Sequence, residues 1–379
     1  MVEHDLAPLQ SWQLGPLDQV VADAIRRLRR APDVQRIAVM PDVHLADDVC
    51  VGVVLGTHCA IYPQAVGGDI GCGMLAVPFE LEAASLREPA AAGRVLARLG
   101  SAVPARRRHR RHSIPMPREL CQPPLSAPEL ESLWRQVGAL ELATLGSGNH
   151  FIELQADETD RLWLMVHSGS RAIGPAIRDH HLERAKPAGA GLKVLAAQEE
   201  PGAAYLADAA WARRFAETNR RQLALLVEEV VLAVCRGRLR WEGAITTDHN
   251  HVEREAHDGT LLWVHRKGAM PAHADQPGVL PGSMGSPSYH VLGRGCAAAM
   301  CSSAHGAGRL LSRTDARRLV TERELHRQMR GVWYDFRNAP RLRDEAPSAY
   351  KNVQEVVRAQ HELTKVVRCL RPVLSYKGV

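Results

Sequence analysis

The sequence predicts a mixed α and β protein, because two different hydrophobic patterns alternate along it. Short apolar runs such as residues 37–40 and 162–166 are typical of buried strands, whereas the apolar residues of 203–235 recur at helical spacing. No Pro- and Ser-rich linker, low-complexity tract or internal repeat divides the 379 residues. We therefore expect one domain that spans residues 1–379.

The first expected elements follow the opening of the chain. Residues 17–28 carry apolar side chains on one face and arginines on the other, which predicts an amphipathic helix. Strands are expected over 37–40, where Pro41 ends the apolar run, over 51–55, and directly after His150.

The second half predicts more helix. Residues 203–235 form one long helix whose apolar stripe belongs to the core. Arg309 and Arg313 are expected four residues apart on a helix, and the apolar positions between 353 and 370 predict a last amphipathic helix.

Composition narrows the class of protein. The 48 basic and 42 acidic residues give a net charge of +6, which suits an anionic partner without proving one. The eight cysteines form no CxxC pair, so neither a disulfide framework nor a zinc ribbon is expected. No apolar run approaches the ~20 residues of a membrane span, and Met1–His4 lack the features of a secretory signal. We expect a cytoplasmic protein without membrane contact.

Residues 66–74 contain the sharpest chemical signal. Asp69 and Cys72 lie three residues apart among four glycines, where tight turns can direct a carboxylate and a thiol at one point. This spacing resembles half of a metal site. A buried cysteine in a glycine-rich turn is the competing interpretation.

Three histidines extend this candidate site. His150, His167 and His249 are each expected beside a strand or in a turn. With Asp69 and Cys72 they could hold two divalent ions that share the thiolate. Mixed N, O and S donors suit Zn, Mn, Fe or Co, and paired ions are typical of phosphoryl chemistry.

Other polar segments suggest contacts with phosphate. Residues 106–112 are a block of arginines and histidines, either a solvated loop or a surface that binds phosphates electrostatically. Residues 281–288 form a loop of small residues whose exposed amides suit a phosphate or nucleotide. His305 has small neighbours, so its imidazole could attack phosphorus; general base, metal ligand and core histidine are the alternatives.

Eight segments, taken together and in order, resemble the RtcB family of RNA ligases. They are Pro41-Asp42-Val43-His44, Asp69-Ile70-Gly71-Cys72-Gly73, Gly148-Asn149-His150-Phe151-Ile152-Glu153, His167-Ser168-Gly169-Ser170-Arg171, His249-Asn250, Arg266-Lys267-Gly268-Ala269, Pro281-Gly282-Ser283-Met284-Gly285 and His305-Gly306-Ala307-Gly308-Arg309.

The resemblance implies an α+β fold with mixed β-sheets in the interior and helices covering them. It also implies a GTP- and manganese-dependent ligase that joins RNA 2′,3′-cyclic phosphate or 3′-phosphate ends to 5′-hydroxyl ends in RNA repair or tRNA splicing. By this resemblance Asp69 and His150 would bind one manganese ion, His167 and His249 the other, and Cys72 would bridge them.

His305 would be the nucleophile that takes GMP from GTP. The implied nucleotide contacts are Asn149, His150, Phe151, Ile152, Glu153, His249, Asn250, Pro281, Gly282, Ser283, Met284, Ser288, His305, Gly306, Ala307, Gly308, Tyr350 and Lys377.

The remaining implied roles concern RNA. Arg171 and Arg313 are expected to hold RNA phosphates, because a planar bidentate donor suits them. Asp42 and His44 are candidates for positioning a water or the attacking hydroxyl. RNA and GTP are the expected partners of a monomer, with an archease-like activator as an open candidate.

Three segments depart from the family pattern. Gly68 replaces an apolar residue, His251 replaces an aromatic or aliphatic one, and Ala46-Asp47-Asp48 replaces a glycine-containing stretch. They suggest a divergent paralogue. Two alternatives therefore stay open: a metal-dependent RNA phosphodiesterase and a non-ligating RNA-binding paralogue.

Overall fold

The computed structural model describes residues 6–46 and 48–378. Met1–His4 and Asp47, which the sequence analysis considered, lie outside this part of the chain. Among the described residues, no helix has both the length and the apolar character needed to cross a membrane.

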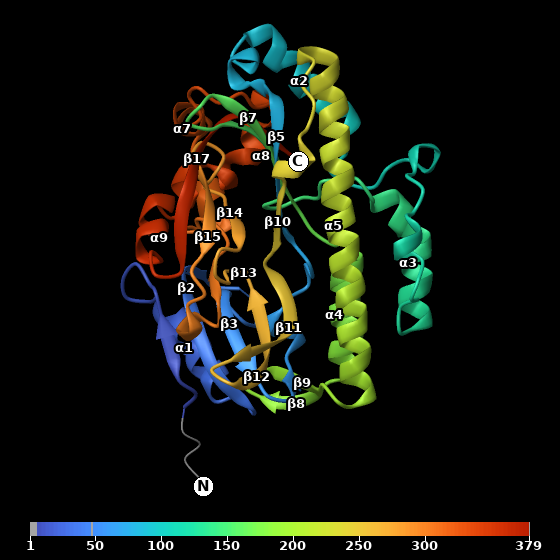
Figure 1. Ribbon diagram of the computed structural model, residues 1–379, viewed down its shortest axis with the longest axis vertical. Coiled ribbons are helices and arrows are strands. Elements are labelled where there is room, and N and C mark those ends of the chain that lie inside the picture. Colours follow the sequence, from blue (N-terminus) through green and yellow to red (C-terminus); the bar gives the residue numbers. More distant parts are fainter. Residues whose placement is uncertain (1–5, 47, 379) are drawn as a thin grey trace.

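A five-stranded sheet is built mostly from the N-terminal segment (Figure 1). Its order is β1 (Leu9–Ser11), β2 (Val34–His44), β3 (Val51–Thr57), β12 (Thr260–Lys267) and β11 (Asn250–His257). Only β1 and β2 pair in parallel. β2 delivers Asp42 and His44 at its end.

A seven-stranded antiparallel sheet carries most of the candidate metal ligands. Its order is β10 (Ile245–Asp248), β5 (Gly73–Glu82), β7 (Arg161–Ser168), β6 (Phe151–Ala156), β17 (Thr364–Lys377), β15 (Ser288–Gly293) and β14 (Pro277–Leu280). The register pairs His167 with both Met74 and Phe151, and Asp248 with Gly73. Residues 72, 150, 167 and 249 therefore lie together at the same end of the neighbouring strands β10, β5, β7 and β6.

Two smaller sheets complete the strands. They contain β13 (Ala269–Pro271) with β16 (Ser302–Ala304), and β4 (Ala60–Ile61) with β9 (Leu192–Ala196) and β8 (Lys186–Gly189). β16 ends immediately before His305.

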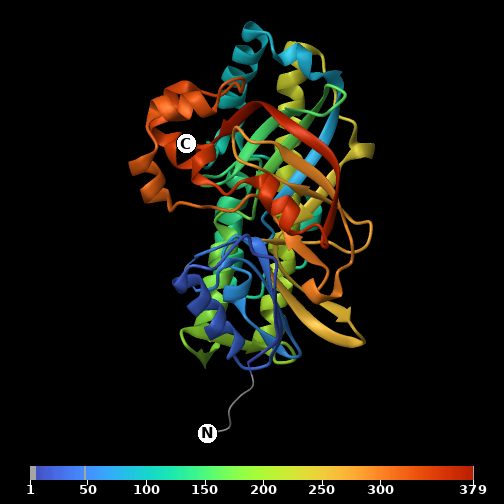
Figure 2. The same ribbon diagram turned by 90° about the vertical axis from the view of Figure 1, so that its left-hand side faces the viewer.

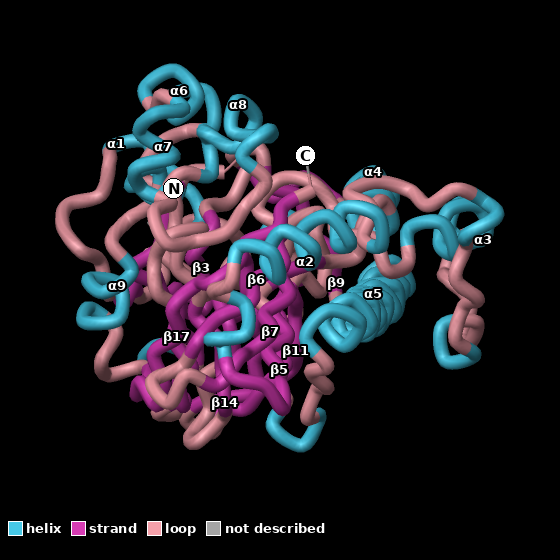
Figure 3. Tube along the Cα trace, turned by 90° about the horizontal axis from the view of Figure 1, so that it is seen from above, coloured by secondary structure: helices cyan, strands magenta, loops and turns pink. Residues whose placement is uncertain are grey.

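Helices lie on both sides of the strands (Figure 3). On one side are α2 (Pro89–Ala102), α3 (Pro128–Glu141), α4 (Ile173–Arg184) and α5 (Glu200–Cys235). On the other are α1 (Gln19–Arg29), α6 (Arg313–Leu319), α7 (Glu322–Gln328), α8 (Ala339–Leu342) and α9 (Val353–Ala359). Figure 2 shows the segment from α6 to α8 standing out to one side of the seven-stranded sheet.

The long helix α5 packs against α2, α4, β5 and β7. Its buried Leu223, Val227 and Val231 join Val77 and Leu164 of the sheet in one hydrophobic cluster. Burial of these side chains holds the helix against the sheet. The predicted core stripe of 203–235 and the mixed α+β fold are thus confirmed.

The prediction of a last helix over 353–370 was wrong beyond residue 359. α9 ends at Ala359, and residues 364–377 form β17 between β15 and β6. The apolar residues happen to recur at helical spacing, but hydrogen bonds to two neighbouring strands decide the conformation, which local periodicity cannot show.

Two smaller predictions also need correction. Arg309 does not share a helix with Arg313, because Ser312 caps α6 by accepting a hydrogen bond from the Asp315 amide. Pro41 does not end β2, which reaches His44 through an irregular register where the missing N–H of proline is tolerated.

Candidate active site

A tight glycine turn directs Asp69 and Cys72 to the same side. The amide of Cys72 donates to the Asp69 carbonyl at 3.1 Å, and Gly71 has a φ of +72°. A Cβ on Gly71 would lie 2.7 Å from the Arg213 Cα, so α5 packs directly against the turn. Both its dihedral and its contact require glycine here.

The structure brings the five proposed donors together. Sγ of Cys72 lies 3.4 Å from Nε2 of His150 and 3.2 Å from Nε2 of His167. Nε2 of His150 lies 2.9 Å from Oδ2 of Asp69, and Nε2 of His167 lies 3.4 Å from Nε2 of His249. They form two groups, Asp69/Cys72/His150 and Cys72/His167/His249, and Cys72 belongs to both.

Helix α5 supports this cluster with polar side chains that the sequence analysis missed. Arg220 donates to the carbonyls of Gly71 and Ser168 at 2.8 and 2.9 Å. Asn219 donates to the Ser168 hydroxyl at 3.0 Å. Both residues are buried, so they fix the backbone on either side of the cluster.

Burial sets the protonation of the donors. It lowers the pKa of His167 and of His249 well below the usual value, aided by neighbouring histidines, so both rings are neutral. Burial and the Asp69 carboxylate raise the pKa of the Cys72 thiol well above its usual value. Burial would raise the pKa of Asp69, but His150 outweighs it and lowers this pKa to about 2. Neutral imidazoles and a carboxylate offer free lone pairs to a cation.

A third group of His251, Glu253 and Glu255 has ligand-like spacing but is already neutralised. Arg266 binds Glu255, and Nη1 of Arg213 donates to Glu253 at 2.6 Å. Because two guanidinium groups occupy the positions where a cation would bind, we assign no metal there.

His305 lies beside the cluster and against a buried carboxylate. Its ring centroid is 4.6 Å from that of His249. Its Nδ1 lies 2.7 Å from Oδ2 of Asp42, and its amide donates to the same oxygen at 3.1 Å. Asp42 is 0% exposed. With Nδ1 facing this carboxylate, Nε2 is the ring atom left for chemistry.

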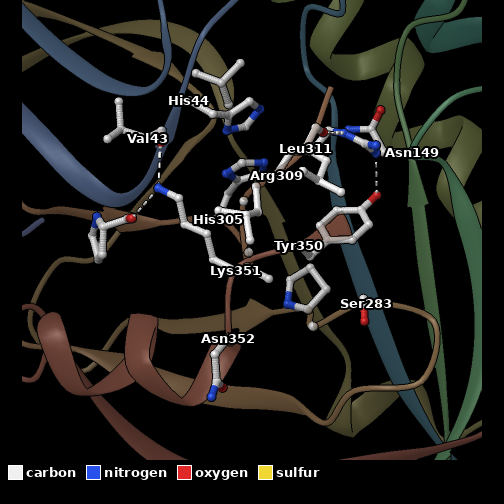
Figure 4. Close-up of a pocket in the computed structure, with 18 of the residues that line it drawn as sticks. Val43, His44, Asn149, Ser283, His305, Arg309, Leu311, Tyr350, Lys351 and Asn352 are labelled. Carbon is white, nitrogen blue, oxygen red and sulfur yellow. Dashed lines mark hydrogen bonds between the residues drawn. The ribbon is translucent and has the colours of Figure 1, made fainter. Parts of the chain in front are cut away.

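His44 approaches His305 from β2. Its Nδ1 lies 2.9 Å from the Asp42 carbonyl, which it reaches as a donor, so Nε2 carries a lone pair. Burial lowers the pKa of His44 to about 4, which keeps the ring neutral. Figure 4 shows the two rings one above the other inside the pocket.

The pocket around these rings has a volume of about 1320 Å³. Of the expected nucleotide contacts, it is lined by Asn149, Phe151, Glu153, Pro281, Gly282, Ser283, Met284, His305, Gly306, Ala307, Gly308, Tyr350 and Lys377. His44, His167 and Arg313 also line it. One cavity therefore contains His305 and the small-residue loop, and it reaches the metal cluster at His167.

Five expected contacts are not among these lining residues. His150 and His249 belong to the donor cluster, and the other three lie behind the lining. Ile152 belongs to the hydrophobic core. Asn250 ties loops together, donating to the Asp69 carbonyl and accepting from the Gly268 amide. Ser288 accepts from Gln155 and from the Gly282 amide.

Glu345 is a pocket residue that the sequence analysis missed. It is 3% exposed and accepts hydrogen bonds from Arg309, Arg313, Tyr350 and Lys377. Apart from Tyr350, these partners lie 32 or 36 residues away in the sequence, so no local pattern indicated the role of Glu345. Glu345 holds the α6–α8 segment to the end of β17.

The two proposed RNA-binding arginines also bind protein groups. Arg171 donates to the Thr144 hydroxyl at 3.0 Å and to the Ala105 carbonyl at 3.3 Å. Nη1 of Arg313 donates to Glu345 at 2.9 Å, and its Nη2 donates to the Asn149 side chain at 3.2 Å.

Two departures from the family pattern have structural reasons. A Cβ on Gly68 would lie 2.8 Å from Nη1 of Arg178, so this guanidinium occupies the space of the missing side chain. His251 is fully buried, with Nδ1 2.9 Å from Asp248 and Nε2 3.1 Å from Arg266. It joins an ion network in place of apolar packing.

Comparison with known proteins matches a family model described as tRNA-splicing ligase RtcB to residues 24–123 and 121–378. A protein named RNA-splicing ligase RtcB1 from a strain of Escherichia coli is 35% identical over 409 aligned positions, which cover 98% of each chain. The RNA-splicing ligase RtcB of Escherichia coli K12 is 34% identical with the same coverage. The tRNA-splicing ligase RtcB of Nanoarchaeum equitans is 33% identical over 291 positions, 64% of this chain and 61% of that protein.

Proposed function

The chain belongs to the RtcB family, and on that premise we propose that it is a GTP- and manganese-dependent RNA ligase. It joins RNA ends that bear a 3′-phosphate or 2′,3′-cyclic phosphate to ends that bear a 5′-hydroxyl. One observation carries the proposal: His305 lies in a large cavity directly beside two donor groups that share Cys72.

The donor set fits two divalent ions. Asp69 and His150 would hold one, His167 and His249 the other, and Cys72 would bridge them, since the donor atoms of each group lie within 4.8 Å of one another. Bound manganese would stabilise negative charge on the reacting phosphates.

His305 acts as the nucleophile. Its Nε2 forms a bond to the α-phosphorus of GTP, and pyrophosphate leaves. Asp42 orients the ring through Nδ1 and stabilises the positive charge that develops on it. The GMP then passes to the RNA 3′-phosphate, and attack by the 5′-hydroxyl releases it.

The remaining pocket residues bind and orient the substrates. Glu153, Tyr350 and Lys377 line the cavity, and we assign them to the nucleotide. His44, with a neutral ring and a free Nε2, accepts a hydrogen bond from the attacking hydroxyl. Arg313 faces the cavity and holds phosphate.

Incubation with GTP labelled at the α-phosphorus and with manganese tests the first step. The protein should acquire an acid-labile GMP, and the His305→Gln variant should not. A ligation assay with defined RNA ends, with and without GTP, tests the complete reaction.

Protein that takes no label from GTP, yet opens 2′,3′-cyclic phosphate ends without joining them, would replace this proposal with a phosphodiesterase. Protein that binds RNA but performs neither reaction would be a non-ligating paralogue.

A further inference from the structure

We propose that residues 105–112, here called the arginine loop, form a docking surface for single-stranded RNA beside the metal cluster. Arg107 and Arg108 hold the loop in place, whereas Arg106, Arg110 and Arg111 bind phosphates of the RNA strand. This inference rests on the proposed function, because it assigns a further part of the same substrate.

Nε of Arg107 and the guanidinium of Arg108 donate hydrogen bonds to protein groups. Nε of Arg107 donates to Oε1 of Glu141 at 3.0 Å. Oε2 of the same buried carboxylate accepts from the Ala172 amide, next to Arg171. Arg108 donates to three backbone carbonyls, those of Ala102, Leu142 and Ala143.

A guanidinium that caps buried carbonyls cannot release them without leaving unpaired acceptors. Burial also lowers the pKa of Arg108, as expected for a cation that packs against the protein. These two arginines therefore hold the loop in place, and the Arg108 guanidinium is not free to bind RNA.

The other three arginines are presented to solvent. Arg106, Arg110 and Arg111 are exposed, and within residues 6–46 and 48–378 none of their guanidinium groups has a hydrogen-bond or ion-pair partner. In the described part of the chain, the one acidic side chain that forms an ion pair with the loop is Glu141, which is bound by Arg107. Three unneutralised cations on a fixed loop suit a polyanion.

The loop begins at the metal cluster. The Ala105 carbonyl accepts from Arg171 at 3.3 Å and from the Gly146 amide at 3.0 Å. A Cβ on Gly146 would overlap both Arg171 and Nδ1 of His150. One layer of contacts thus separates Ala105 from a proposed manganese ligand.

From this point the chain runs outward. In Figure 1 it leaves the neighbourhood of the C-terminus and crosses to α3, outside α5. An RNA strand whose reacting end lies at the cluster would continue along the arginines. Residues 105–112 contain no Phe, Tyr or Trp on which bases could stack, so we expect electrostatic contacts that are independent of base sequence.

Binding of a single-stranded RNA oligonucleotide with 5′-hydroxyl and 3′-phosphate ends, measured by fluorescence anisotropy from 50 to 300 mM NaCl, tests the inference. The Arg106→Gln/Arg110→Gln/Arg111→Gln variant should lower the slope of log Kd against log salt by about 2, because three phosphate contacts of roughly 0.7 each are lost. A control changes Arg236, Arg238 and Arg240, which are exposed and follow the C-terminal end of α5, to Gln. Its slope should equal that of the unchanged protein.

Guanylylation with GTP and manganese alone separates this inference from the proposed function. Both triple variants should take up label at the rate of the unchanged protein, because neither alters the pocket. If the unchanged protein takes no label, the proposed function fails. The salt dependence of RNA binding still shows whether the arginine loop binds phosphates.

Equal slopes for the arginine-loop variant and the unchanged protein would overturn the inference and leave the loop free for another anion, such as an acidic protein. If the triple variant does not fold, the Arg110→Gln/Arg111→Gln variant serves instead, with an expected slope change of about 1.4.

Discussion

Nδ1 of His305 lies 2.7 Å from Oδ2 of Asp42, although the two residues are 263 positions apart in the sequence. Asp42 lies near the end of a strand of one sheet, and His305 follows a strand of another. A Cβ on Gly308 would clash with the Asp42 carbonyl, so the two segments can pack this closely only with glycine there. The carboxylate thereby fixes which ring nitrogen faces the cavity.

Asp42→Asn should lower the rate of guanylylation by roughly 10²- to 10⁴-fold, because the ring loses the charge that orients it and stabilises its cationic form. Labelling with GTP measures the rate. Bound manganese should not change, since Asp42 is not among the proposed ligands. The exposed Asp48→Asn is the control. Equal rates for the two variants would mean that Asp42 has only a structural role.

Cys72→Ala should reduce the manganese retained after dialysis and abolish GMP transfer, because this thiol belongs to both donor groups. Elemental analysis measures the metal directly. The exposed Cys59→Ala should retain both properties. Unchanged metal content in Cys72→Ala would exclude the bridging role.

Glu345→Gln should lower the free energy of unfolding by about 3–5 kcal/mol, the typical result of removing one partner from a buried ion pair. The substitution removes the buried counter-charge of Lys377 and Arg309, whereas Arg313 keeps its ion pair with Asp344. Urea unfolding measures the change. Glu324→Gln on the surface, where Glu324 pairs with Arg327, should leave the midpoint unchanged. A Glu345 variant as stable as this control would contradict the prediction.

Glu153 should make the protein less stable as the pH rises. Burial raises the pKa of its carboxyl from 4.5 to about 8, so the folded protein holds a proton that the unfolded chain has lost. The stabilisation is fully present below pH 4.5 and is lost progressively up to about pH 8, at no more than about 1.4 kcal/mol per pH unit.

Urea unfolding between pH 5 and 8 checks this. For Glu153→Gln, the free energy of unfolding should lack this part of its pH dependence. The unchanged protein should therefore lose stability relative to the variant as the pH rises. The same substitution at the exposed Glu183 should leave the slope intact. Parallel pH profiles for the unchanged protein and Glu153→Gln would show that the carboxyl is ionised in the fold.

A residue of the candidate site could be predicted from the sequence when its neighbours in the chain formed a recognisable pattern. Asp69 and Cys72 share one glycine turn, and His167 ends a strand that its own apolar run predicts. Glu345 had no such signal, because its four partners come from residues 309, 313, 350 and 377. Residues 106–112 were recognisable as basic, but the division between anchoring and free arginines depends on Glu141 and on carbonyls from other segments.

By itself the sequence determined the mixture of strands and helices, the types of metal-ligand side chain and the order of the family's segments, because each of these depends on residues that are close together in the chain. The tertiary structure alone decided that residues 364–377 form a strand, that Asp42 faces His305 and that Cys72 lies in both donor groups. These facts depend on pairing between segments hundreds of residues apart, where hydrogen bonds and burial outweigh local preference.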